Sequence, residues 1–243
     1  MFDHVTIRAS DRGATERFYD TVLEPLGISK SHADPDGAMW ADLGMYAVDG
    51  THPATRGLHI GFVAPSRAHV DRFWEAGTRA GYRDDGAPGP RPEYGDDYYG
   101  GFLLDPDGNS AEAVHHDTLR SGGIVDHLWI RVADVAASRA FYATVAPQAG
   151  FELRLDTPQR ARFAGPSGSF SVLAGARPTE HLHIAFPAPD NATVDRFHAA
   201  ATRAGYRDHG APGLRLAYHE GYYGAFVLDP DGNNVEVVCH NDG

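Results

Sequence analysis

The chain has 243 residues, of which 42% are hydrophobic, enough to bury one large or two small cores. Its formal net charge of −12 argues against nucleic acid as a partner and, less strongly, against anionic membranes. Cys239 is the single cysteine, so no internal disulfide can form, and we expect a cytoplasmic protein. We expect neither a signal peptide nor a membrane span, because no apolar run is long enough.

The predicted elements occur in the same order in two halves of the chain. Residues 57–116 and 181–240 are identical at 38 of 60 positions, and the opening strand and helix recur at a similar offset. Self-similarity of this kind is typical of a duplicated structural unit. We therefore predict two domains, 1–118 and 124–243, joined by a linker at 119–123.

The first repeat begins with a strand at 4–8 and a helix that Ser10 or Asp11 caps and Gly27 ends. After weakly patterned strands come a strand at 58–63, a helix from Ser66 to Gly81 and a hairpin. The weak strands are placed at 38–43, 45–48, 152–156, 160–163 and 169–173, and the later strands of the second repeat at 182–186, 224–228 and 235–239. Each repeat reads βαβββ twice, which predicts an α+β fold with every helix on one side of its sheet.

The last hairpin of each repeat carries a carboxylate in an unusual place. The turn sequence LDPDGN is followed by a strand on which Glu112 or Glu236 stands among apolar neighbours. A carboxylate in the middle of such a strand is costly unless it has a partner. A lone glutamate would more often face solvent, but its recurrence in both repeats favours a partner.

Two histidines accompany each glutamate, one on the opening strand and one on the strand before the second helix. The latter shares its face with a small residue, Gly61 or Ala185, which leaves open space beside it. Two imidazoles and a carboxylate bind a divalent ion and leave positions for substrate or water. A single histidine is more often a packing or surface residue, whereas this set occurs twice. The predicted metal ligands are His4, His59, Glu112, His127, His183 and Glu236.

Further polar and aromatic residues lie near these positions. Gly-Ala-Pro-Gly segments at 86–89 and 210–213, expected to be loops, precede an arginine and several tyrosines that either orient an oxygen-rich substrate or pack. The candidate substrate-binding residues are Arg91, Tyr94, Tyr98, Arg215, Tyr218 and Tyr222. The candidate catalytic residues are Tyr99, Tyr223, His116 and His240, and the two histidines are alternatively solvated strand ends.

On these residues the chain resembles the vicinal oxygen chelate superfamily of glyoxalases, bleomycin-resistance proteins and extradiol dioxygenases. The resemblance rests on the opening strand with its histidine, on HIGF and HIAF, and on LDPDGN followed by glutamate, and it covers nearly the whole chain. It implies tandem glyoxalase-like domains, each of two βαβββ modules that form a cupped mixed sheet around a metal, with helices on the outer face. Modules of this superfamily can pair across domains, so His4 meets either its own repeat's ligands or His183 and Glu236.

Two departures from the family's patterns bear on the reaction. Glyoxalase I enzymes use a fourth ligand, a glutamate late in the first module, and neither 25–74 nor 153–179 contains one. Extradiol dioxygenases carry a tyrosine ten residues before the glutamate, where this chain has Phe102 or Phe226.

The resemblance and the residues together predict a divalent-metal-dependent enzyme that binds a small substrate through two adjacent oxygens. We favour a dioxygenase-type oxygenase with Fe(II). The alternatives are a glyoxalase- or epimerase-like isomerase or lyase with Mn, Ni, Co or Zn, and a drug- or metabolite-binding resistance protein. We expect a small molecule as the partner, and a monomer with paired domains or a homodimer.

Overall fold

The computed structural model describes residues 1–117 and 122–241. Most of the predicted linker, 119–123, therefore lies outside the described residues. Within them the chain forms sixteen strands and four α-helices, in the order βαβββ repeated four times, and a 3-10 turn at Glu24–Leu26. The predicted α+β class and the predicted order of elements are confirmed.

The chain divides into two compact units that each combine parts of both repeats. The unit that we call the His59 unit spans Thr6–Trp129, and the His183 unit spans Met1–Val5 and Ile130–Gly243. The chain passes between the units within β1 (His4–Ala9) and within β9 (Val125–Val132). Each repeat's opening residues, His4 and His127 included, therefore belong to the unit built mainly from the other repeat.

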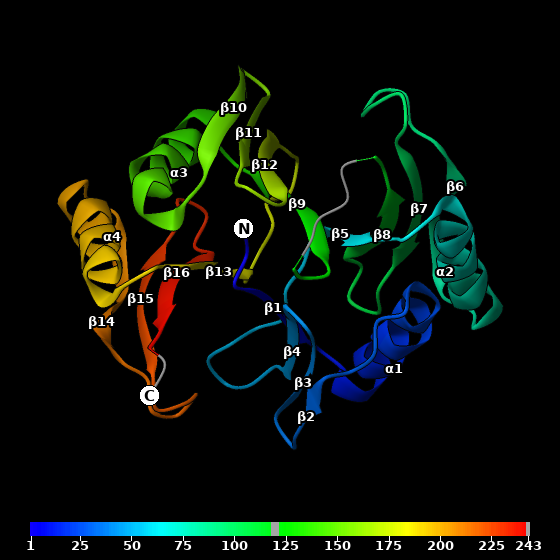
Figure 1. Cartoon of the computed structure of the whole chain (residues 1–243), viewed down its shortest axis with the longest axis horizontal. Coiled ribbons are helices and arrows are strands. Elements are labelled where there is room, and N and C mark those ends of the chain that lie inside the picture. Colours follow the sequence, from blue (N-terminus) through cyan, green and yellow to red (C-terminus); the bar gives the residue numbers. More distant parts are fainter. Residues whose placement is uncertain (118–121, 242–243) are drawn as a thin grey trace. The chain divides into compact units, whose positions relative to one another are not determined.

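The strands of the His59 unit belong to two mixed sheets, with β5 to β8 in one and β2 to β4 in the other. Strands β5 and β8 pair in parallel, whereas β6, β7 and β8 form an antiparallel ladder, as do β2, β3 and β4. Helix α2 packs along β6 and β7 (Figure 1). The elements are β2 (His32–Ala33), β3 (Gly37–Trp40), β4 (Leu43–Ala47), β5 (Leu58–Val63), β6 (Arg83–Pro90), β7 (Tyr99–Leu104), β8 (Ser110–His115), α1 (Arg12–Leu23) and α2 (Arg67–Arg79).

The strands of the His183 unit are likewise divided, with β13 to β16 in one sheet and β10 to β12 in the other. Strand β13 pairs in parallel with β16, β14 and β15 continue the ladder antiparallel, and β10, β11 and β12 are antiparallel to one another. Helix α4 packs against β14 and β15 (Figure 1). The elements are β10 (Glu152–Thr157), β11 (Arg160–Ala164), β12 (Ser169–Ala174), β13 (His183–Pro187), β14 (Arg207–Leu214), β15 (Tyr222–Leu228), β16 (Asn234–His240), α3 (Val135–Ala149) and α4 (Asn191–Arg203).

Each unit has an aromatic core. Large rings that are fully buried include Phe18, Tyr19, Trp40, Phe62 and Phe73 in the His59 unit and Tyr142, Phe163, Phe170, Phe186 and Phe197 in the His183 unit. Each buried ring of this size stabilises the fold by roughly 2–3 kcal/mol relative to its exposed state. Because these rings come from helices and from alternate strand positions, the intervening strand residues face the other side of the sheet, where polar side chains can gather.

The LDPDGN turns fix the strand that carries each glutamate. The Asn109 backbone N–H donates to Asp105 Oδ1 at 2.8 Å, and Asn109 Oδ1 accepts from the Leu58 backbone N–H at 3.1 Å, which ties the turn to the start of β5. In the second repeat, Asn233 Oδ1 accepts from the Leu182 backbone N–H at 3.0 Å. The register of the two parallel strands, and hence the position of the glutamate, is set by these bonds.

The Gly-Ala-Pro-Gly segments are not loops, which corrects the expectation from the sequence. They belong to β6 and β14, where Gly86 aligns with Phe102 and Gly210 with Phe226. The register shifts on either side of these glycines show bulges. Glycine and proline signal a loop to sequence reasoning, yet both residues are tolerated at the bulges of an edge strand.

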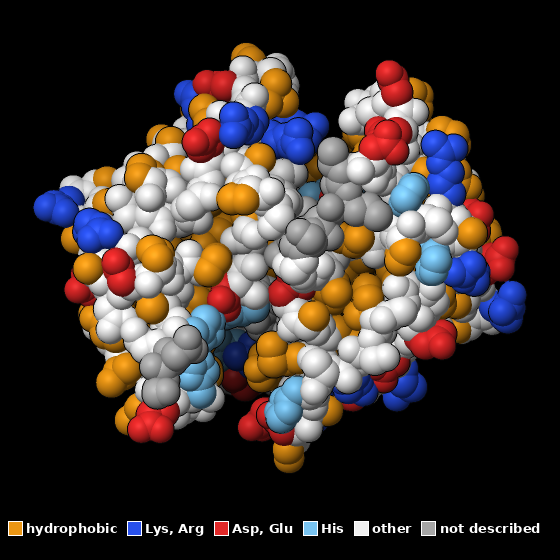
Figure 2. Space-filling model, in the orientation of Figure 1, with side chains coloured by type: hydrophobic (Ala, Val, Ile, Leu, Met, Phe, Trp, Pro, Cys, Tyr) orange, Lys and Arg blue, Asp and Glu red, His pale blue; other side chains and the backbone are white. Residues whose placement is uncertain are grey.

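No helix among residues 1–117 and 122–241 is long and apolar enough to cross a membrane. On the face of the molecule drawn in Figure 2, Lys and Arg side chains are scattered among Asp and Glu side chains.

Candidate metal centres

Three of the predicted ligands converge in the His59 unit. Glu112 Oε2 lies 2.9 Å from His59 Nε2 and 3.2 Å from His127 Nε2, and the two Nε2 atoms lie 3.3 Å apart. The glutamate side chain is 1% exposed and each histidine side chain 8%. The solvent-facing alternative for this glutamate is therefore wrong. We call these three residues the His59 site.

The strand pairing explains this convergence. In the parallel β5–β8 pair, Gly61 aligns with Glu112, and His59 lies two residues before Gly61 on the same sheet face. His127 comes from the part of β9 that belongs to this unit. A side chain at position 61 would collide with the His127 ring, so the small residue creates the space that the ring occupies.

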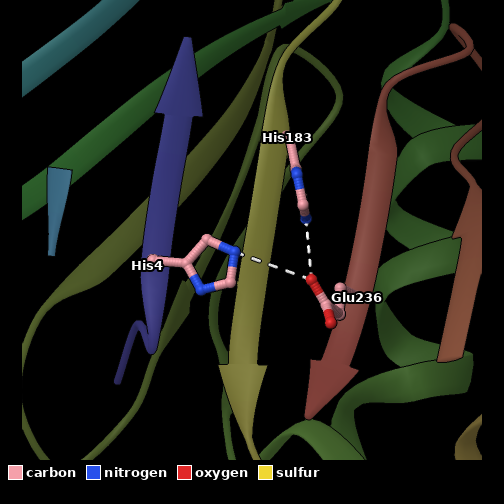
Figure 3. A group of neighbouring side chains, drawn as sticks. All are labelled: His4, His183 and Glu236. Carbon is pink, nitrogen blue, oxygen red and sulfur yellow. Dashed lines mark hydrogen bonds and ion pairs between the residues drawn. The ribbon is translucent and has the colours of Figure 1, made fainter. Parts of the chain in front are cut away.

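The other three predicted ligands converge in the His183 unit and form the His183 site. His183 Nε2 lies 2.9 Å from Glu236 Oε2, and His4 Nε2 lies 3.6 Å from the same oxygen. Figure 3 shows His4 on β1, His183 on β13 and Glu236 on β16 pointing toward one another. Sequence reasoning left open whether His4 joins its own repeat's ligands, and the structure groups it with those of the second repeat.

A tyrosine holds the second oxygen of each glutamate. The Tyr98 hydroxyl donates to Glu112 Oε1 at 2.8 Å, and the Tyr222 hydroxyl donates to Glu236 Oε1 at 2.6 Å. Burial, then the negative charge of Glu112, raises the pKa of Tyr98 well above its usual range, so the phenol remains a donor. With Oε1 occupied in this way, each glutamate presents Oε2 alone to its two histidines.

An aspartate orients the first-strand histidine of each site. Asp126 Oδ2 lies 2.9 Å from His127 Nδ1, and Asp126 Oδ1 lies 3.1 Å from His116 Nε2. In the His183 unit, Asp3 bridges His4 Nδ1 at 2.8 Å and His240 Nε2 at 2.9 Å. A hydrogen bond from Nδ1–H to a carboxylate directs the Nε2 lone pair toward an ion, as is usual for metal-binding histidines.

The electrostatic environment of the His59 site favours a positive charge. Burial lowers the pKa of His127, but hydrogen bonds with Asp126 and Glu112 outweigh it and raise that pKa to about 9. Burial likewise raises the pKa of Glu112, whereas hydrogen bonds with His127 and His59 outweigh it and lower the pKa to about 2. At neutral pH the site therefore holds a positive imidazolium between two carboxylates, and a divalent cation would meet the same favourable field.

Two other candidates face away from these sites. Tyr99 donates to Asp71 on α2, and Tyr223 donates to Asp195 on α4. Both therefore point toward the helices, because they alternate along the chain with Tyr98 and Tyr222. This orientation gives neither hydroxyl a contact with the glutamates.

The remaining substrate-binding candidates, Arg91, Tyr94, Arg215 and Tyr218, lie outside the two groups of metal ligands. Arg91 stacks over Phe102, whose ring centroid is 5.9 Å from that of His59. Arg215 stacks over Phe226 in the same manner. Tyr94 is 42% exposed and meets the Trp129 ring edge-on, with centroids 5.2 Å apart, whereas Tyr218 is 62% exposed.

Sequence reasoning missed three residues near the ligands. Asp3 and Asp126 precede the first-strand histidine in each repeat, and this recurring Asp-His pair was the signal that could have identified them. Trp129, whose ring centroid is 5.1 Å from that of His59, has Thr6 at the equivalent position of the first repeat, so no recurrence signalled it.

The donor set in each site fits a divalent ion. In both groups the ligand atoms of two histidines and one glutamate lie within 4.8 Å of one another. Two neutral imidazoles and a carboxylate suit Fe(II), Mn, Ni, Co and Zn alike, and three protein ligands leave coordination positions for other ligands.

Similarity to known proteins agrees with this picture. Glyoxalase I from Zea mays has 17% identity, with a TM-score of 0.70 over 98% of this chain and 92% of that one, and a variant of it has 18% identity and a TM-score of 0.72 over 98% and 93%. A proposed dioxygenase from Bacillus subtilis has 13% identity and a TM-score of 0.69 over 100% and 86%. Among curated proteins none matches significantly. At these identities the structural likeness shows a shared fold alone.

Paired βαβββ modules with two histidines and a glutamate on one sheet face define a class of candidate metal-chelating proteins. The model of the Glyoxalase/Bleomycin resistance protein/Dioxygenase superfamily matches residues 1–113 and 124–237, and the chain belongs to this superfamily. The resemblance inferred from the sequence, including the tandem arrangement of glyoxalase-like repeats, is thus confirmed. The mixed sheets are open rather than closed.

Proposed function

We propose that this protein is a metal-dependent enzyme that binds a small substrate through two adjacent oxygens. One observation carries the proposal: two groups of two imidazoles and one carboxylate, one buried and one half-buried, form within separate units of one chain. His59, Glu112 and His127 would hold one ion, and His4, His183 and Glu236 the other. A bound divalent ion supplies Lewis acidity and, with iron, redox chemistry.

The protein's own residues would support this chemistry by position. Tyr98 and Tyr222 keep each glutamate oriented, and Asp126 and Asp3 fix the ring nitrogens of the first-strand histidines. Trp129, whose ring centroid is 5.1 Å from that of His59, is proposed to limit the access of water to the His59 site. Arg91, Tyr94, Arg215 and Tyr218 are proposed to contact the substrate beyond this inner group.

The reaction that we favour is oxygenation of a substrate with neighbouring oxygens, using Fe(II). The two-histidine, one-carboxylate set with open positions is the donor set that Fe(II) oxygenases use. An isomerase or lyase is the second candidate, and the pairing of His116 with Asp126 favours it. This histidine can hold or release a proton at Nε2, and two hydrogen bonds through Asp126 connect it to the ligand His127.

Metal content and oxygen dependence test the proposal together. Protein purified without oxygen should contain up to two metal ions per chain, and His59→Ala and His183→Ala should each remove one of them. His69→Ala is the matched control, because His69 lies on α2 and bonds to Ser66 away from both sites. Unchanged metal content in both site variants would refute metal binding.

Oxygen uptake then separates the reaction classes. With Fe(II) and aromatic diols, an oxygenase consumes O₂ and stops when O₂ is removed. Equal turnover of an α-hydroxy ketone without O₂, with Mn or Zn in place of iron, would instead establish the isomerase. Metal-free protein that binds these compounds without converting them would indicate a drug- or metabolite-binding protein.

A further inference from the structure

The two sites differ at one position beneath the ligands. Gly61 aligns with Glu112 in the β5–β8 pair, and Ala185 aligns with Glu236 in the β13–β16 pair. These are equivalent positions of the two repeats, and aligned residues of parallel strands share a sheet face. The His59 site therefore lies over a bare backbone, and the His183 site lies over a methyl group.

The His127 ring occupies the space that Gly61 leaves open. A Cβ atom at position 61 would lie 2.5 Å from His127 Nδ1 and 3.0 Å from Nε2, and closer still to Cε1. Real Cβ atoms essentially never approach other atoms that closely, so His127 can lie there only because position 61 is glycine. Any side chain at this position would displace the imidazole.

The geometry of the His183 site agrees with such a displacement. His4 Nε2 is 3.6 Å from Glu236 Oε2, whereas His127 Nε2 is 3.2 Å from Glu112 Oε2. The histidine rings are nearly parallel in the His59 site, at 26°, and edge-on in the His183 site, at 76°. The second site is also more open, with His183 22% exposed against 8% for His59.

Other features beneath the ligands do not distinguish the sites. Gly100 and Gly224 both lie against the Oε1 atom of their glutamate, and both glutamates accept a tyrosine hydroxyl there. The distance from the second histidine to the glutamate is 2.9 Å in both sites. Beneath the ligands the sites therefore differ at position 61 or 185, and beside them Trp129 of the His59 site has Thr6 as its equivalent.

We propose that Gly61 and Ala185 make the two metal sites unequal, so that the His59 site is tight and the His183 site weak. The inference rests on the proposed metal binding and deepens it. The residue beneath a histidine ligand sets the orientation of its ring, and changes to groups that orient metal ligands alter metal affinity by about 10–100-fold. The chain would then carry one site that is filled at low metal concentration and one filled only at high concentration.

Cobalt titration of single-site proteins tests the inference. Glu236→Gln leaves the His59 site intact, and Glu112→Gln leaves the His183 site intact. The visible spectrum and calorimetry give the Co(II) dissociation constant of each. We expect the His59 site to bind at least tenfold more tightly.

The exchange of the two residues provides the decisive comparison. Gly61→Ala in the Glu236→Gln protein should weaken Co(II) binding at least tenfold, and Ala185→Gly in the Glu112→Gln protein should strengthen it. Two matched controls change the same methyl group elsewhere. Position 50 has open space around it, so Gly50→Ala should leave the affinity unchanged, and Ala225→Gly changes a buried residue that aligns with Val237 rather than Glu236.

The outcomes separate the inference from the proposed function. Equal affinities that neither exchange alters would overturn the inference and leave metal binding intact. Absence of Co(II) binding in the unmodified protein would overturn the proposed function itself. If Gly61→Ala fails to fold, Ala185→Gly still decides the matter, because removal of a methyl group causes no collision.

Discussion

Metal binding at the His59 site should release a proton and strengthen with pH. The pKa of His127 is about 9, so at pH 7 the metal-free site is protonated and an ion must displace that proton. Two pH units correspond to about 100-fold in affinity, or about 3 kcal/mol. In the Glu236→Gln protein, the apparent Co(II) affinity should rise about tenfold per pH unit between pH 7 and 9 and then level off.

Calorimetry in buffers of different ionisation enthalpy counts the released protons. We expect about one proton per ion at pH 7 and fewer near pH 9. Asp126→Asn is the matched variant, because an amide oxygen still accepts from His127 Nδ1 but the negative charge that raises its pKa is gone. The affinity of this variant should level off at a lower pH. A constant affinity between pH 7 and 9 without proton release would refute the reasoning.

Three further predictions concern the support of the ligands. Tyr98→Phe removes a hydrogen-bond donor from the buried Glu112, and urea unfolding should show that the free energy of unfolding falls by about 1–3 kcal/mol. Tyr99→Phe should lower it by less, because the Tyr99 hydroxyl donates to a residue outside the site. Gly100→Ala places a Cβ against Glu112 Oε1 and should abolish metal at the His59 site, whereas Gly50→Ala should not; retained metal would contradict the tight fit. In metal-free protein, the raised pKa of His127 stabilises the folded state. This contribution is fully present below pH 6.5, the pKa of His127 in the unfolded chain, and is lost as the pH rises through about 9. The melting temperature should therefore fall between pH 6.5 and 9. A profile that is flat over this interval would show that His127 does not titrate as described.

Much of the fold could be predicted because most sequence patterns that indicate strands, helices and turns occur in both repeats. The strand 58–63 was predicted with its observed bounds, Asp11 caps α1 as one of the two predicted residues, and Gly81 follows α2 with a positive φ of 87°. The short β2 strand was missed, since two exposed residues, His32 and Ala33, carry no periodicity. The Gly-Ala-Pro-Gly segments of β6 and β14 were predicted as loops. Their bulges depend on pairing with the neighbouring strand, which the sequence of the segment alone does not show.

The membership of each site could not be predicted from the residues alone. All six ligand residues were visible in the sequence, but alternation along a strand says only which face of the sheet a side chain takes. Which first strand lies beside β13 is decided by long-range packing. The role of Gly61 was visible in part, as open space beside His59, but nothing in the sequence showed that a histidine ring from the other repeat would fill it.

Crystals of the protein grown with Co(II) and measured at the cobalt absorption edge test the central claim most directly. We expect one anomalous peak among His59, Glu112 and His127 and, at higher Co(II) concentration, a second among His4, His183 and Glu236. Crystals saturated with Co(II) that show no peak at either group would contradict it.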